Sequence, residues 1–161
     1  MGKIGLAWTL AAMTSLIPGC YPESPPPCPA IAMAPVVSLT IQASYVHEVK
    51  SIRMKACQDG ACMEADLELF PGSVSVDQGC APEGVCSATS TPDGTLHGNL
   101  FLPNLTESPI DATVSGTSPS GTALPVRTLT FTPKGDYPFG EQCGRFITAN
   151  LVLDATGLRQ G

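Results

Sequence analysis

The chain has few aromatic residues, few charged residues and only two histidines. Of its 161 residues, 6% are Phe, Trp or Tyr and 14% are charged, with 8 Lys and Arg against 14 Asp and Glu. So little positive charge does not suit nucleic acid or anionic lipid headgroups as partners. His47 and His97 have no spacing typical of a metal site or a catalytic relay, and His97 is expected to face outward from a strand. Gly-x-Ser-x-Gly, the serine hydrolase motif, is absent. We therefore expect no enzyme activity, no cofactor and no metal site.

The chain also lacks an apolar run long enough to cross a bilayer. Its first segment has a positive charge at Lys3 and an apolar stretch over residues 4–17 that contains Thr9, Thr14 and Ser15. This stretch is shorter than the roughly 20 residues that a membrane-spanning helix needs. A short positive region followed by an apolar region is typical of a secretory signal peptide. We predict that residues 1–19 are a signal peptide and are removed.

The residues at the end of this segment suggest how the protein is anchored. Leu16-Ile17-Pro18-Gly19-Cys20 resembles the lipobox of bacterial lipoproteins, although Pro18 departs from the usual small residue. The resemblance implies that Cys20 is acylated, with chains such as palmitate, and becomes the new N-terminus. The protein would then be held on the outer side of the cytoplasmic membrane, facing the periplasm or the cell exterior. The alternative is an ordinary secreted protein in which Cys20 joins a disulfide.

The cysteine count bears on this choice, because seven cysteines leave one unpaired in an oxidising compartment. If Cys20 carries lipid, six remain, and six cysteines allow fifteen pairings. Closeness in sequence favours two pairs and leaves a third by elimination. No spacing is the Cys-x-x-Cys typical of zinc or redox sites, so structural disulfides are the better interpretation. The favoured set is Cys57–Cys62, Cys80–Cys86 and Cys28–Cys143.

The remaining chain has the size of one domain behind a spacer. Removal of residues 1–19 leaves 142 residues, with seven Lys and Arg against 14 acids, or a net charge near −7. Residues 20–35 are rich in proline, which predicts an extended spacer that holds the domain away from the membrane. Residues 36–161 show short β-branched runs separated by Gly, Pro, Asp and Ser, which predicts an almost all-β domain.

The clearest strand pair is a hairpin over residues 51–69. Strands over residues 51–58 and 61–69 are joined by Asp59-Gly60, a dipeptide that favours a type I′ turn. This turn places Cys57 opposite Cys62, at a distance within disulfide reach. The same face carries Arg53 opposite Asp66 and Lys55 opposite Glu64. The other face is expected to meet the core and carries Ile52, Met54, Ala56, Met63, Ala65 and Leu67.

Further runs bring the expected number of strands to about seven. They predict an immunoglobulin-like two-sheet β-sandwich stapled by disulfides. Residues 72–94 are rich in Gly, Ser, Pro and Asp and are expected to form turns, with Cys80 and Cys86 closing a small loop. We interpret this loop as decoration in preference to a recognition surface. The other expected strands cover residues 36–43, 95–102, 110–115, 126–132 and 146–153.

The hairpin motif Cys57-Gln58-Asp59-Gly60-Ala61-Cys62 also carries a resemblance. It is similar to the Cys-x-Asp-Gly-x-Cys hairpin of small exported proteins and lipoproteins of actinobacterial type. The resemblance extends through residues 138–144 and 149–157 and covers roughly residues 36–157. It implies a β-sandwich and no assigned reaction, and it supplies no catalytic residues.

These observations predict a non-enzymatic, membrane-anchored extracytoplasmic lipoprotein that acts as a binding or assembly module. Its partners would be the membrane, through the N-terminal lipid, and a protein or glycan bound by its loops or a sheet edge. The alternative is a secreted accessory or inhibitor domain that modulates another exported protein through the loop closed by Cys80 and Cys86. Tyr137, Pro138 and Phe139 near Cys143 are expected to pack into the core under their loop in preference to forming an exposed aromatic contact patch. An exposed Phe139 would indicate a partner surface.

Overall fold

The computed structural model describes residues 27–30 and 34–161 and shows a chain built almost entirely of β-strands. The predicted signal peptide, residues 1–19, and the predicted lipid site Cys20 lie outside the described residues. No helix among residues 27–30 and 34–161 is long and apolar enough to cross a membrane. The elements are β1 (Val36–Ile41), η1 (Val46–Glu48), β2 (Ser51–Gln58), β3 (Ala61–Asp66), β4 (Phe70–Cys80), β5 (Cys86–Phe101), β6 (Ile110–Thr117), β7 (Arg127–Phe131), β8 (Lys134–Asp136), η2 (Glu141–Cys143), β9 (Phe146–Asp154) and β10 (Gly157–Gln160).

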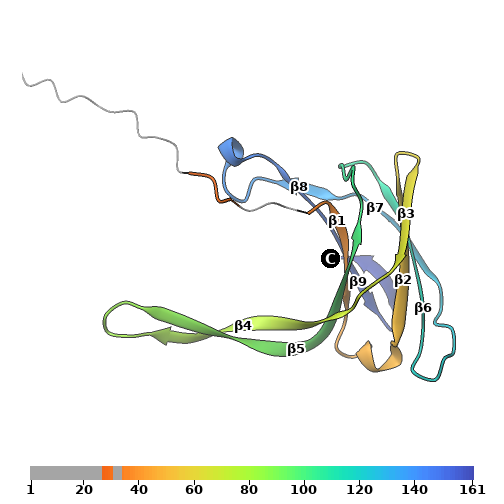
Figure 1. Ribbon diagram of the computed structural model, residues 1–161, viewed down its shortest axis with the longest axis horizontal. Coiled ribbons are helices and arrows are strands. Elements are labelled where there is room, and N and C mark those ends of the chain that lie inside the picture. Colours follow the sequence, from red (N-terminus) through yellow and green to blue (C-terminus); the bar gives the residue numbers. More distant parts are fainter. Residues whose placement is uncertain (1–26, 31–33) are drawn as a thin grey trace, which may run out of the picture.

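The strands form two sheets (Figure 1). The first sheet has the order β10-β9-β1-β5-β4, with β8 pairing β9 beside this path, and the second has the order β3-β2-β6-β7. The predicted all-β, two-sheet architecture is therefore confirmed. All seven predicted strands have counterparts, while β4, β8 and β10 were not expected.

The immunoglobulin-like identity of the sandwich stays a prediction. Immunoglobulin domains have strands A, B, E and D in one antiparallel sheet and strands G, F and C in the other. The orders β9-β1-β5-β4 and β7-β6-β2-β3 match this plan if β1 takes the place of strand B. However, β9 then takes the place of strand A, although it follows β7 in sequence and runs parallel to β1. The pairing of β1 with β9 is thus a departure from two purely antiparallel sheets.

The core lies between the two sheets and is formed by alternate residues of the strands. In β1, Val37, Leu39 and Ile41 are fully buried, whereas the residues between them are half-buried. The same alternation recurs in β2, β6 and β9, as a period of two requires when one face of a sheet is covered. Each fully buried aliphatic side chain contributes about 1.5–3 kcal/mol to folding. The largest fully buried side chains are Leu39, Ile41, Ile52, Met54, Ile110, Leu151, Val37 and Val114.

The hairpin of β2 and β3 has the predicted register. Cys57 pairs with Cys62, and Asp59 and Gly60 have φ angles of 50° and 82°, as a type I′ turn requires. The expectation that the whole apolar face meets the core is only half right. β3 is an edge strand with all of its residues exposed, and its Met63 is 40% exposed. The core covers β2 and Leu67 but does not extend over Met63 and Ala65.

The structure contains three disulfides at the predicted pairs, namely Cys28–Cys143, Cys57–Cys62 and Cys80–Cys86. The Cα atoms of Cys57 and Cys62 are 4.0 Å apart, in keeping with a non-hydrogen-bonded pair in an antiparallel hairpin. Cys28–Cys143 joins the segment before β1 to η2, 115 residues later. Three disulfides are typical of proteins that fold in an oxidising compartment outside the cytoplasm.

Candidate functional site

The main feature outside the sandwich is a long two-stranded arm, formed by residues 73–92 of β4 and β5 (Figure 1). The arm begins where β5 leaves β1, whose pairing partners in β5 are residues 96–101. Every residue of the arm is exposed. Because no other strand among the described residues pairs with residues 73–92, the backbone groups along both outer edges are free to bind another strand.

The two faces of the arm differ in chemistry. Val74 and Val76 pair with Thr91 and Thr89, which gives one face a row of β-branched side chains. The opposite face carries Ser73, Ser75, Ser90 and other small or polar residues. Val74 and Val76 are each more than two-fifths exposed, although Val is usually buried. The β-branched face therefore offers an apolar strip that nothing in the described chain covers.

The tip of the arm is held by a disulfide and by short hydrogen bonds. Cys80 pairs with Cys86 across the tip, and the N–H of Ala81 donates to the carbonyl of Val85 at 2.8 Å. At the start of the turn, the N–H of Gly79 donates to Oδ1 of Asp77 at 2.7 Å. Val85 is 71% exposed between these restraints. The loop that the sequence suggested to be decoration is thus the end of a projecting, stapled arm.

A polar cluster fixes the root of the arm on the outer face of the first sheet. The hydroxyl of Thr95 lies 2.7 Å from Oδ1 of Asp93 and 3.0 Å from Nε2 of His97. Nδ1 of His97 lies 3.0 Å from the hydroxyl of Thr40. These hydrogen bonds from Thr95, first from its side chain and then from its backbone, lower the pKa of Asp93 below its usual value. His97 faces away from the core, as predicted, but is half-buried by these contacts.

The same cluster explains a buried glycine in β4. A Cβ atom at Gly72 would lie 2.6 Å from both Oδ1 of Asp93 and Nε2 of His97. The cluster also lacks the arrangement of an activated nucleophile. A carboxylate only accepts hydrogen bonds, so the Thr95 hydroxyl donates its proton to Asp93 and accepts from the Nε2–H of His97. A nucleophile would instead donate its proton to the imidazole. The cluster is an anchor for the arm.

The two acidic residues of β3, Glu64 and Asp66, are neutralised differently from the predicted cross-strand pairs. Arg53 contacts both acids on β3, with Nε 2.7 Å from Glu64 and one amino group 3.1 Å from Asp66. Glu64 therefore pairs with Arg53, although Lys55 is its cross-strand partner. Among residues 27–30 and 34–161, no group of three or more His, Cys, Asp and Glu side chains is arranged to hold a metal ion.

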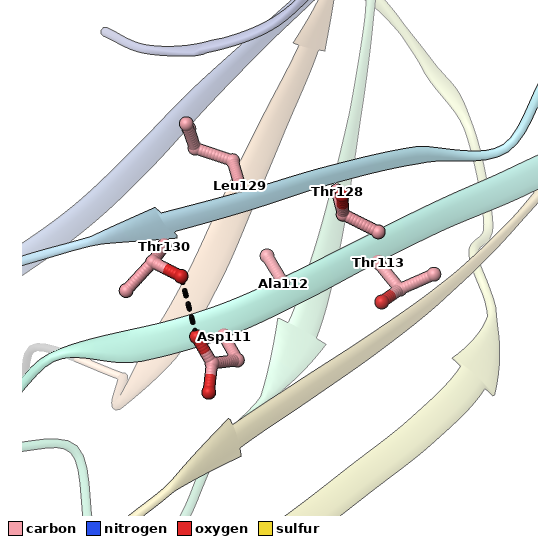
Figure 2. Close-up of a pocket in the computed structure, with 6 residues that line it drawn as sticks. All are labelled: Asp111, Ala112, Thr113, Thr128, Leu129 and Thr130. Carbon is pink, nitrogen blue, oxygen red and sulfur yellow. Dashed lines mark hydrogen bonds between the residues drawn. The ribbon is translucent and has the colours of Figure 1, made fainter.

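The hollows on the described surface are shallow. One of them, of about 260 Å³, lies over β6 and β7 on the second sheet (Figure 2). Inside it, the hydroxyl of Thr130 donates to Asp111 at 2.6 Å. Asp111 is the one titratable residue in the lining, so the hollow holds no acid–base pair. Its other lining residues are Ala112, Thr113, Thr128 and Leu129.

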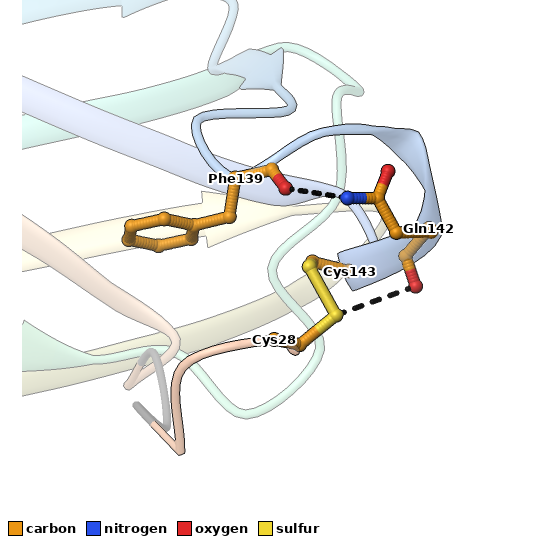
Figure 3. Close-up of a disulfide and its surroundings, with 4 residues drawn as sticks. All are labelled: Cys28, Phe139, Gln142 and Cys143. Atoms are coloured by element: carbon orange, nitrogen blue, oxygen red, sulfur yellow. Dashed lines mark hydrogen bonds between the residues drawn. A yellow bond between two sulfur atoms is a disulfide. The ribbon is translucent and has the colours of Figure 1, made fainter. Parts of the chain in front are cut away.

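A second surface feature is an aromatic corner, defined by Tyr137, Phe139 and Phe146. Figure 3 shows Phe139 near the Cys28–Cys143 disulfide. The expectation that Tyr137 and Phe139 pack into the core is wrong, because they are 42% and 39% exposed. The rings of Phe139 and Phe146 meet edge to face at 5.5 Å, and the guanidinium of Arg145 lies 5.8 Å from the centre of the Tyr137 ring. The loop around η2 thus holds its aromatic rings at the surface.

Sequence reasoning missed the arm because its residues look like turn formers. A weak signal was present, since Val74 and Val76 alternate with Ser73, Ser75 and Asp77 as a strand requires. Comparison with other proteins adds no further indication, since no protein family, curated protein or solved structure matches the chain.

Proposed function

We propose that this protein is an exported, lipid-anchored and non-enzymatic binding module, and that the arm, residues 73–92, is its contact surface. The observation that carries the proposal is the arm itself, which is fully exposed, stapled at its tip and anchored at its root. An isolated two-stranded ribbon is at best marginally stable in water. A disulfide at the tip and a half-buried polar cluster at the root make this ribbon a rigid surface for a partner.

The chemistry of the arm limits the kind of partner. The chain from residue 56 to residue 126 contains no Lys or Arg, and the arm carries Asp77 and Glu83 near its tip. A partner surface is therefore neutral or basic, and nucleic acid is disfavoured. The free edges of the arm suit an extended protein segment that adds as a further strand, with Val74 and Val76 supplying apolar contacts. A protein partner fits these features better than a glycan.

The lipid at Cys20 is the second part of the proposal. Its support is the lipobox-like sequence 16–20, the odd cysteine count and the use of all six other cysteines in disulfides. The test is the intact mass of protein extracted from membranes. An acylated chain that begins at Cys20, with six thiols appearing only on reduction, is the expected result. A mass without acyl chains would refute the anchor.

The arm is tested by photo-crosslinking in cells, with a photoreactive residue at Val85 and a control at Ser120 in an exposed turn outside the arm. We expect a discrete crosslinked protein from Val85 and none from Ser120. Val76→Ser should weaken binding of that protein roughly five- to tenfold, the effect of losing about 1 kcal/mol of contact energy. Val126→Ser, at a valine outside the arm that is 63% exposed, should leave binding unchanged. Equal labelling at both sites would refute the arm as the contact surface.

A second candidate function is inhibition of another exported protein. It is favoured by the disulfide at the tip, because a rigid, projecting loop loses little entropy when it enters a cleft. In this case the protein crosslinked to Val85 is an enzyme, and adding the domain lowers its activity. If the purified crosslinked partner kept full activity, the binding or assembly function would stand and inhibition would not.

A further inference from the structure

The Cys28–Cys143 disulfide determines which end of the domain lies nearest to the proposed lipid. It binds the segment before β1 to η2, beside the aromatic corner (Figure 3). Cys28 is only eight residues from Cys20 in the sequence. Eight residues span at most about 29 Å even when fully extended. The aromatic corner is therefore confined to the neighbourhood of the bilayer once Cys20 is acylated.

Without this disulfide the tether would be longer. The first strand begins at Val36, sixteen residues after Cys20, and sixteen residues reach up to about 58 Å. The disulfide thus halves the free tether and restricts which end of the domain can approach the membrane, because the chain leaves from one corner. A domain on the longer tether would tumble freely above the membrane.

The side chains at this corner suit the boundary between headgroups and acyl chains. Tyr137 and Phe139 are exposed rings, and tyrosine is enriched at membrane interfaces because it has an apolar body and a polar tip. Charges of both signs surround them. Arg145 is paired with Glu107 at 2.7 Å, Asp136 ends β8 and Glu141 begins η2. The corner therefore has no net attraction to anionic headgroups, and its contact with lipid would be apolar.

We propose that Tyr137 and Phe139 insert into the membrane interface and orient the domain on the bilayer, an inference that rests on the proposed lipid at Cys20. Only about two-fifths of each residue is exposed and can become buried in the bilayer. This area is too small to hold the protein on a membrane without another anchor. The covalent lipid removes this difficulty, because it keeps the corner at a high effective concentration near the bilayer. The partner of this surface is a lipid bilayer, contacted through its apolar interface and not through its headgroup charge.

Tryptophan fluorescence provides a direct test. The single tryptophan of the chain, Trp8, lies in the predicted signal peptide. Phe139→Trp therefore gives a mature protein with one reporter in the corner, and Phe70→Trp gives a matched control at the root of the arm, where Phe70 is 50% exposed. The full-length lipoproteins are placed in vesicles of phosphatidylcholine brominated on the acyl chains, which quench tryptophans that enter the bilayer.

We expect the emission of the Phe139→Trp protein to shift to the blue and to lose most of its intensity, while that of Phe70→Trp stays unquenched. Inserting about twenty Gly and Ser residues between Ser24 and Pro25 should restore the Phe139→Trp emission, because a longer flexible tether lowers the effective concentration. Raised salt should change nothing. If Phe139→Trp disturbs folding, Tyr137→Trp provides the same readout.

The outcomes separate the two proposals. Intact mass shows whether each protein is acylated at Cys20, and an unacylated chain refutes the anchor and with it this inference. An acylated, vesicle-bound protein with equal quenching at positions 139 and 70 leaves the anchor in place and refutes the membrane contact of the corner. Crosslinking of the corner to a protein, or to a second copy, in place of lipid would also refute it.

Discussion

At the scale of single residues, Gln58 shows how a polar group is accommodated at the end of the core. Its side chain is 5% exposed and forms three hydrogen bonds to the loop before β6. Nε2 donates to the carbonyls of Thr106 and Ser108 at 3.0 and 2.7 Å, and Oε1 accepts from the N–H of Thr106 at 3.0 Å. The side-chain amide of Gln58 thus provides the hydrogen bonds that a neighbouring strand would otherwise give to this loop. The adjacent Cys57–Cys62 disulfide helps to hold Gln58 in position.

Replacing Gln58 should therefore destabilise the whole domain. Gln58→Leu leaves three backbone groups without a partner, which should lower the free energy of unfolding by about 2–3 kcal/mol. The measurement is urea denaturation followed by circular dichroism. The control is Gln78→Leu, because Gln78 also bonds the backbone but is exposed on the arm. This change should stay within about 0.5 kcal/mol. Equal effects of both changes would contradict the role of Gln58.

Asp154 gives the fold a pH dependence. Its Oδ1 accepts hydrogen bonds from the hydroxyl and the N–H of Thr156 in the turn between β9 and β10, and then from the N–H of Gly157. These bonds favour the carboxylate and hold its pKa below the ordinary value of 3.8. A lowered pKa in the folded state contributes stability above the unfolded value, and this contribution is lost as the pH falls through the lowered pKa.

Asp154→Ala should accordingly reduce the urea midpoint at pH 7. The difference from the wild type should shrink as the pH is lowered below 3.8, because the wild-type carboxyl then becomes protonated as well. Urea midpoints of both proteins between pH 7 and pH 2.5 check this expectation. A difference that stays constant across the range would show that Asp154 acts through packing and not through its charge.

At the scale of elements, the arm differs in burial from the remaining parts of β4 and β5. β5 is continuous, yet its residues 96–101, which pair with β1, include buried and half-buried positions, whereas residues 73–92 of β4 and β5 are entirely exposed. Local stability follows buried contacts, so the arm should open without unfolding the sandwich. The Cys80–Cys86 disulfide counteracts this opening at the far end, and the Asp93–Thr95–His97 cluster does so at the root.

The double change Cys80→Ser with Cys86→Ser should separate arm stability from domain stability. Hydrogen exchange in residues 73–92 should become much faster, while exchange in β1, β2 and β6 and the unfolding temperature stay nearly unchanged. Hydrogen exchange read by mass spectrometry on proteolytic fragments resolves the two regions. Loss of protection throughout the sandwich would instead mean that the arm takes part in global folding.

At the scale of the whole molecule, Cys28–Cys143 closes the longest covalent loop. Its 115-residue separation encloses nearly the entire domain, and the entropy removed from the unfolded chain grows with the length of the loop. The hairpin disulfide, with a separation of five residues, restrains the unfolded chain much less. The longest bridge should therefore contribute most to global stability.

Removing this bridge by Cys28→Ser and Cys143→Ser should cost about 2–4 kcal/mol. Cys57→Ser with Cys62→Ser should cost less, because the short hairpin loop is also held by its turn and its ladder. Denaturant titrations of both double variants, made under the same conditions, give the comparison. An equal loss for the two variants would show that strain or packing at the bridges outweighs the entropy of loop closure.

The sequence alone determined the features that depend on neighbours in the chain. Asp59-Gly60 fixed the hairpin register and therefore the Cys57–Cys62 pair, and alternation of apolar residues marked the strands that face the core, because both follow from local backbone geometry. Tertiary structure decided the rest. Whether Met63, Phe139 and the strand around Val74 and Val76 are covered depends on where the facing elements end, and the width of each sheet is set by contacts between distant segments. The projecting arm and the exposed aromatic corner, on which both proposals depend, arise from that long-range decision.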